Sequence, residues 1–306
     1  MELHQLRYFC AVAREGSFTR AAEREGISQP SLSQQIKKIE IEFGVPLFER
    51  LGRTTRLTSF GEALLADATA ILRHVSGADA AITALRDGMR GRLRVGAIPT
   101  ILPFFVAPHL REFRDLHPEV EIVLSEDMTR GLVERLQSGE IDVALAALPV
   151  KNPDIVCSEL FREPLLVAVG RDHRLASASS VELSEVRHER MLLLKEGHCF
   201  RENVLTACTR ANVEFHSIFE SDQFASIFPL VASGFGVSLV PAMAVAHAKD
   251  CRILPLAKPA FRRVGYLQAR HRFISNPKRA FLMWLRDVTR NLARAHPYKM
   301  KPSTIE

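Results

Sequence analysis

The chain has 306 residues, of which 47% are hydrophobic and 25% charged, and its formal net charge is +6. This length exceeds one typical core, so two or three domains are expected. No apolar run reaches the roughly 18 residues of a membrane span. The first residues, Met1 to Arg7, show no basic segment followed by an apolar one, so we expect no signal peptide and a cytoplasmic protein.

The first sixty residues predict three short helices. Apolar residues recur at helical spacing over Leu3–Ala13, Gly16 ends that helix, and Ser17 caps the next one. Gly26 permits the tight turn that follows, because glycine adopts a positive φ at little cost. Ser28 is then a good cap for a third helix. The pattern is typical of a helix-turn-helix.

The third predicted helix, Gln29 to Phe43, buries one apolar face and turns polar side chains outward. Hydroxyls and amides reach base edges and lysines reach phosphates, so we expect this helix to enter the DNA major groove. The basic segment Arg50 to Thr58 reads as a wing hairpin on the DNA. A three-helix core with a merely solvated polar face is the alternative. The expected DNA-binding residues are Ser28, Gln29, Pro30, Ser31, Ser33, Gln34, Lys37, Arg50 and Arg53.

A long alanine-rich stretch, residues 60–88, carries an apolar stripe at helical spacing. A helix of this length without a globular partner in its own segment usually pairs with another chain. Burial inside its own chain is the alternative.

From Gly91 to about Arg290, strands and helices alternate, which predicts an α/β fold with a largely parallel sheet. The expected strands are 93–97, 121–125, 141–146, 165–169, 191–194 and 236–240, and the expected helices are 103–117, 129–138 and 200–212.

Three short segments follow expected strands of this part. Thr100 and Thr129 follow the first two strands, and His198, Cys199 and Arg201 follow 191–194. Ligands bind at the carboxyl ends of strands in such sheets, so these residues form a candidate pocket for a small polar or anionic ligand. The alternative is that both threonines only cap helices.

Five cysteines are spread along the chain, and their odd number argues against a structural disulfide framework in the cytoplasm. No Cys-x-x-Cys pair or His/Cys cluster predicts a metal site, and no cofactor is expected. The cysteines are Cys10, Cys157, Cys199, Cys208 and Cys251.

Cys199 falls at the expected start of a helix, beside His198 and near Arg201, and such surroundings favour a thiolate. A thiolate attacks hydrogen peroxide and becomes a sulfenic acid, which Cys208 could resolve into a disulfide. On one helix the two residues would lie about 13 Å apart, whereas a disulfide needs about 7 Å between Cα atoms. Disulfide formation would therefore require that helix to unwind. The alternative is that either cysteine is a small buried hydrophobe.

Four segments closely resemble the winged helix of LysR-type regulators, and the similarity extends over essentially the whole chain. They are Leu6–Phe9, Gly16–Ala22, Ser28–Ser33 and Gly44–Arg50. The resemblance implies a winged helix-turn-helix at 1–59, a dimerisation linker helix at 60–90 and an effector domain at 91–306. The last would contain two α/β subdomains of periplasmic-binding-protein type: subdomain I at about 91–161 and 268–300, and subdomain II at about 162–267.

Within that family, Lys195–Arg201 followed by Cys208 resembles the redox segment of OxyR-type peroxide sensors. This similarity implies a homodimeric or homotetrameric activator of antioxidant genes that binds inverted half-sites in double-stranded promoter DNA, with RNA polymerase as a further partner. The alternative is a LysR-type regulator whose organic-acid effector is held by Thr100 and Thr129. A third hypothesis, that the protein is a thiol peroxidase, is disfavoured by the predicted N-terminal DNA-binding domain. We therefore expect no enzyme.

Overall fold

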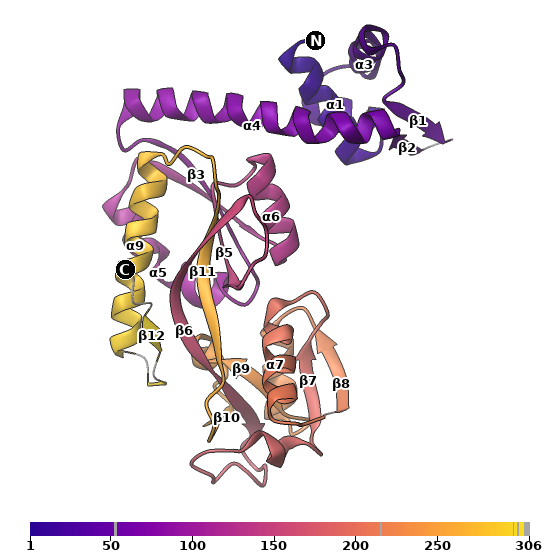
Figure 1. The fold of residues 1–306 in the computed structure, drawn as a ribbon. Helices are drawn as coiled ribbons and strands as arrows, with labels where there is room; N and C mark the ends of the chain where they lie inside the picture. Colours follow the sequence, from indigo (N-terminus) through magenta and orange to yellow (C-terminus); the bar gives the residue numbers. More distant parts are fainter. Residues whose placement is uncertain (52–53, 215, 296, 299, 303–306) are drawn as a thin grey trace. The chain divides into compact units, whose positions relative to one another are not determined.

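The computed structural model describes residues 1–51, 54–214, 216–295, 297–298 and 300–302. The chain divides into two compact units, one formed mainly by Met1–Ile82 and the other by Thr83–Leu136 with Glu140–Glu306 (Figure 1). No helix among the described residues combines the length and hydropathy that crossing a membrane requires.

The first unit is a winged helix-turn-helix followed by a long helix. Gly16 and Gly26 end the first two helices with φ of 58° and 69°. The Oγ atoms of Ser17 and Ser28 accept hydrogen bonds from the N–H groups at the starts of the next two helices, at 3.4 and 3.3 Å. The residues expected to end and cap these helices therefore do so. The elements are α1 (Leu3–Glu15), α2 (Phe18–Glu25), α3 (Gln29–Phe43), β1 (Phe48–Leu51), β2 (Thr54–Leu57) and α4 (Ser59–Asp87).

The core of the first unit fixes the orientation of α3. Leu32, Ile36 and Ile39 are buried on one face of that helix, against Phe9 of α1. Phe48 of the hairpin closes this core, with its ring centroid 5.3 Å from that of Phe9. The polar face of α3 is consequently turned away from the core.

Helix α4 keeps large apolar side chains in contact with solvent along its length. Phe60, Ile71, Val75 and Ile82 are 53%, 38%, 37% and 65% exposed. Exposed apolar residues repeated along one helix are typical of a helix that pairs with a second chain.

The second unit contains a mixed sheet with strand order β10-β6-β11-β5-β3-β4. Strand β3 pairs in parallel with β4 and β5, whereas β11 runs antiparallel to β5 and β6. The elements of its first half are β3 (Gly91–Ala97), a π-helical turn (Leu102–Val106), α5 (Ala107–Leu116), β4 (Val120–Glu126), α6 (Thr129–Ser138), β5 (Val143–Leu148), β6 (Ile155–Gly170), β11 (Phe261–Ala269) and α9 (Asn276–Ala295). A short strand, β12 (Lys301–Pro302), also pairs with β6.

A second half of this unit is inserted between β6 and β11. Strands β9 and β10 pair antiparallel with β6, and β7 pairs in parallel with β8 as a separate two-stranded sheet. Its elements are two 3-10 helices (Leu183–Val186 and Ala242–His247), β7 (Arg190–Leu194), α7 (Cys199–Arg210), β8 (His216–Ser221), α8 (Phe224–Ala232), β9 (Ser238–Pro241) and β10 (Cys251–Pro255).

Two separate hydrophobic cores lie in the second unit, and β6 contributes to both. Its residues Ile155, Leu160 and Phe161 belong to the first core, and Leu165–Val169 to the second. Strands β6 and β11 thus connect two α/β subdomains, which confirms the predicted fold class.

Three expectations about this unit need correction. The expected strand 165–169 is the end of a 16-residue strand, β6, because the chain continues from one core into the other without a break. The expected helix 103–117 begins with a π-helical turn, and its α-helical part starts only at Ala107. The sheet is also less parallel than predicted, since the connecting strands run antiparallel.

Candidate functional site

Seven of the nine predicted DNA-binding residues lie on α3 or at its N-terminus. Ser28, Pro30, Ser31, Gln34 and Lys37 are exposed. Gln29 and Ser33 are half-buried on the same helix. The polar face of α3 offers hydroxyl, amide and ammonium groups, which suit base edges and phosphates.

The two wing arginines are less fully described. The backbone of Arg50 pairs with Thr55 in the β1–β2 hairpin. Arg53 lies outside the described residues.

The candidate sensing site surrounds the start of α7, where the chain leaves β7. Gly197 adopts φ of 92°, which lets residues 195–198 turn back before the helix begins at Cys199. The N–H of Lys195 donates to the carbonyl of Ser221, at 2.9 Å, so this turn is joined to the end of β8.

Two cationic side chains, one in this turn and one at the start of α7, are paired with carboxylates at the end of β8 and just after it. Lys195 Nζ lies 2.7 Å from Asp222 Oδ2. Arg201 Nη1 lies 2.6 Å from Glu220 Oε1 and also donates to the carbonyl of Leu194, at 2.9 Å. Arg201, predicted to line an effector pocket, therefore connects β7, α7 and β8. The sequence pattern did not indicate the two carboxylates, because they lie 27 and 19 residues from their partners.

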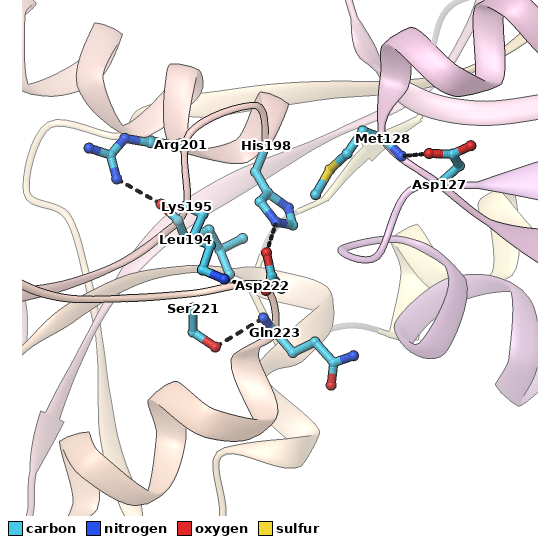
Figure 2. A network of polar contacts seen from close by, with 9 residues as sticks. All are labelled: Asp127, Met128, Leu194, Lys195, His198, Arg201, Ser221, Asp222 and Gln223. Carbon is cyan, nitrogen blue, oxygen red and sulfur yellow. Dashed lines mark hydrogen bonds and ion pairs between the residues drawn. The ribbon is translucent and has the colours of Figure 1, made fainter. Parts of the chain in front are cut away.

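His198 is 2% exposed and makes no hydrogen bond through Nε2 among the described residues. That atom lies 3.7 Å from Asp222 Oδ1, which is too long for a hydrogen bond. Burial lowers the pKa of His198, and the Asp222 carboxylate opposes this effect only in part. The ring is therefore neutral at pH 7, and in Figure 2 the side chain of Met128 extends toward it.

The two candidate redox cysteines lie in different surroundings on the same helix. Cys199 is half-buried and packs against the first core, whereas Cys208 is 3% exposed inside the second core. Burial raises the pKa of the Cys208 thiol to about 11, so this group is protonated at neutral pH. Both belong to α7, which spans Cys199–Arg210, so the nine-residue separation corresponds to about 13 Å along the axis.

The two predicted pocket threonines differ in their bonding. Thr100 is 2% exposed, and its Oγ1 and carbonyl accept hydrogen bonds from Arg262, at 2.9 and 3.0 Å. Arg262 also pairs with Glu163, at 2.5 Å, and both side chains of this pair are fully buried. Thr129 begins α6, and its buried Oγ1 has no hydrogen-bond partner among the described residues. Thr129 therefore retains a free hydroxyl, while Thr100 is bonded within a buried ion pair.

A cavity of about 480 Å³ lies between the subdomains, but it contains neither threonine. Phe104, Phe224 and Phe228 are part of its lining, together with two acidic residues, Glu126 and Asp250, and two basic ones, His247 and Lys249. The two threonines that the organic-acid hypothesis assigns to the effector therefore do not line this cavity. The described residues also contain no group of three His, Cys, Asp or Glu side chains placed to hold a metal ion.

The two parts of the chain match two parts of one family. Residues 3–62 match the bacterial regulatory helix-turn-helix protein, lysR family, and residues 86–290 match the LysR substrate binding domain. A "Hydrogen peroxide-inducible genes activator" of Dickeya chrysanthemi is 31% identical over 303 residues, covering 98% of each chain.

Two solved structures extend this likeness to the fold. Full-length OxyR C199D from Pseudomonas aeruginosa has 33% identity and a TM-score of 0.78, covering 100% of this chain and 99% of its own. Full-length CbnR complexed with its target DNA has 26% identity and a TM-score of 0.65, covering 94% of this chain and 100% of its own. The matched proteins are transcriptional regulators and not enzymes. The chain belongs to the LysR family of DNA-binding transcriptional regulators.

Proposed function

We propose that this chain is a peroxide-responsive transcriptional regulator in which Cys199 is the residue that peroxide oxidises. The observation that carries the proposal is the position of this half-buried thiol at the first residue of α7, with the unbonded, neutral imidazole of His198 immediately before it. The names of the OxyR and peroxide-inducible relatives support the same function.

In the first step, the Cys199 thiolate attacks one oxygen of hydrogen peroxide and the O–O bond breaks. The sulfur becomes a sulfenic acid, and the leaving hydroxide takes up a proton and departs as water. His198 and the Thr129 hydroxyl are candidate groups to hold the peroxide, since each has a buried polar atom without a bonded partner. Thr100 and Arg201 would support the site indirectly, through Arg262 and Glu220.

In the second step, the Cys208 thiol attacks the Cys199 sulfenic acid, an S–S bond forms, and water leaves. The two thiols cannot meet while α7 is intact, because about 13 Å separates them along the helix. Oxidation would therefore unwind α7 and withdraw Phe200 and Cys208 from the second core. That change would alter the oligomer that presents the α3 faces to two inverted half-sites of a promoter, a homodimer or homotetramer paired through α4.

The output would be activation of antioxidant genes through RNA polymerase. The organic-acid alternative finds less support, because Thr100 is already hydrogen-bonded to Arg262 and neither threonine lines the cavity between the subdomains.

Peptide mass spectrometry without reductant, on full-length protein titrated with hydrogen peroxide, tests the sensing step. We expect a Cys199–Cys208 disulfide at near-stoichiometric peroxide, and loss of peroxide-dependent transcription in Cys199→Ser. Cys157→Ser, which changes an exposed cysteine away from α7, is the matched control. A Cys199 thiol that remains free under these conditions would refute the proposal.

Promoter binding at several salt concentrations tests the DNA face separately. We expect Lys37→Ala to weaken binding to all sequences and to reduce the salt slope by about 1, as loss of a phosphate contact does. An unchanged slope would remove Lys37 from the interface.

A further inference from the structure

A second cavity, of about 840 Å³, lies along α7, and of that helix's residues in the second core only Ala207 lines it. Asn203, Thr206 and Arg210 of this helix line it, spaced three and four residues apart. Phe200, Val204 and Cys208 face the core instead. One helix therefore separates this cavity from the buried Cys208 thiol.

The remaining walls combine apolar surface with an excess of positive charge. Leu148, Leu183 and Phe261 supply apolar surface. The basic side chains are Arg210, Lys258, Arg262 and Arg263, against the single carboxylate of Glu182.

The charged groups of the wall differ in how far they are already engaged. Arg262 pairs with Glu163 and Arg263 with Glu159, and the Glu182 carboxylate caps a 3-10 helix. Arg210 and Lys258 are exposed, and neither makes an ion pair among the described residues. Two unpaired cations beside an apolar wall suit an anion that carries an apolar body.

We propose that this cavity binds an organic anion with a ring-sized apolar body, and that the bound anion opposes formation of the Cys199–Cys208 disulfide. The second clause rests on the proposed peroxide response. The ligand would contact Thr206 and Arg210 only while α7 is helical, whereas the disulfide requires that helix to open. A ligand that binds one of two states shifts the equilibrium toward that state. The protein would thus respond to peroxide only when the anion is scarce.

The size of the effect follows from mass action. A ligand present at ten times its dissociation constant, and bound only to the helical state, lowers the population of the opened state by about eleven-fold. Disulfide formation that waits on this opened state slows by the same factor.

The first experiment measures binding to the reduced full-length protein, with 8-anilinonaphthalene-1-sulfonate as the probe, because it joins one anionic group to apolar rings. We expect Lys258→Gln to weaken its binding by about three- to five-fold, the range of a partly exposed ion pair, and Lys258→Gln/Arg210→Gln to weaken it further. The uncharged N-phenyl-1-naphthylamine should bind the wild-type protein and Lys258→Gln with the same affinity. Arg279→Gln, at an exposed arginine on α9 outside the cavity, is the matched control. Equal affinity for Lys258→Gln and Arg279→Gln would overturn the site.

The second experiment repeats the peroxide titration with the probe at ten times its dissociation constant. We expect disulfide formation to slow about eleven-fold in the wild-type protein. In Lys258→Gln, whose helix α7 is unchanged, the same probe concentration is only about two to three times the dissociation constant, so we expect a slowing of about three- to four-fold. Unaltered kinetics despite probe binding would overturn the antagonism. Absence of any disulfide, with or without probe, would instead refute the disulfide step of the proposed peroxide response, and the binding measurements would still decide whether the anion site exists.

Discussion

The two ends of α7 place one cysteine each in opposite surroundings. At the N-terminal end, Cys199 is half-buried beside a turn whose charged side chains are paired at the surface. At the C-terminal end, Cys208 is 3% exposed among apolar side chains. The difference separates two requirements of a redox switch: a thiol that a small oxidant reaches in the folded protein, and a second thiol that becomes available only after the helix opens.

The two ends are also held by different forces. Phe200, the second residue of α7, lies with its ring centroid 5.1 Å from the Arg262 guanidinium and 5.3 Å from the Phe224 ring. The C-terminal half is held by burial of Val204, Ala207 and Cys208. Opening α7 therefore disturbs a buried charge at one end and apolar packing at the other.

The largest expected effect comes from the buried charge at the N-terminal end. Glu163→Gln leaves the fully buried Arg262 guanidinium without its carboxylate, which typically costs about 3–5 kcal/mol. We expect the free energy of unfolding of the second unit, measured by urea denaturation, to fall by this amount. The control is Glu159→Gln on the same strand, whose arginine partners are exposed and whose loss should cost about 1 kcal/mol or less. Equal losses in the two variants would show that the buried pair does not anchor this end.

A substitution at the apolar, C-terminal end of α7 should change the unfolding free energy less, but it should change the oxidation product at Cys199. Cys208→Ala removes one buried sulfur and should cost about 1 kcal/mol of unfolding free energy. We expect Cys199 in this variant to be trapped as a sulfenic acid, which dimedone labelling followed by mass spectrometry detects. Failure of dimedone to label Cys199 while peroxide is consumed elsewhere would contradict the division of roles between the two ends.

The strength of the helix between the two cysteines should set the rate of the second step. Thr209 is an exposed residue of α7, so Thr209→Gly and Thr209→Ala change helix propensity and little else. The two residues differ by about 1 kcal/mol in a helix interior and by less near its end, so we expect disulfide formation about two- to five-fold faster in the glycine variant. Rapid-quench mass spectrometry at fixed peroxide measures this ratio. Identical rates would mean that opening of α7 does not limit disulfide formation.

Local signals in the sequence predicted the helices of the winged helix and the start of α7, but not the full length of β6 and not the bonds between elements. The position of α7 could be predicted because a helical stretch follows the apolar strand 191–194, and the predicted helix 200–212 differs from Cys199–Arg210 by one or two residues at each end. The winged helix was predictable for the same reason, since a serine caps or a glycine ends each of its short helices.

The partners of the site residues were not predictable, because they come from distant parts of the chain. Thr100 is bonded to Arg262, which lies 162 residues later, and Arg262 pairs with Glu163 across two adjacent strands. Nothing in the local pattern around Thr100 distinguishes a hydroxyl that is free for a ligand from one that is already bonded. The same limit applies to Arg201, whose partner Glu220 comes from β8.

The smallest expected effect is a pH dependence confined to the N-terminal end. Burial lowers the pKa of His198, so below about pH 6.5 the unfolded chain binds a proton that the folded protein resists. Stability should therefore be highest above that pH and should fall as the pH drops toward the folded-state pKa. We expect His198→Gln to lose less unfolding free energy between pH 7.5 and 5.5 than the wild type does, whatever its stability at either pH.

His216→Gln, at an exposed histidine of β8, is the matched control and should keep the wild-type pH dependence. The C-terminal end contributes nothing in this pH range, because the Cys208 thiol, with a pKa of about 11, stays protonated throughout. A pH dependence that survives in His198→Gln would therefore have to come from groups outside α7 and its turn. In that case the burial of His198 would not be the cause of the loss of unfolding free energy at low pH.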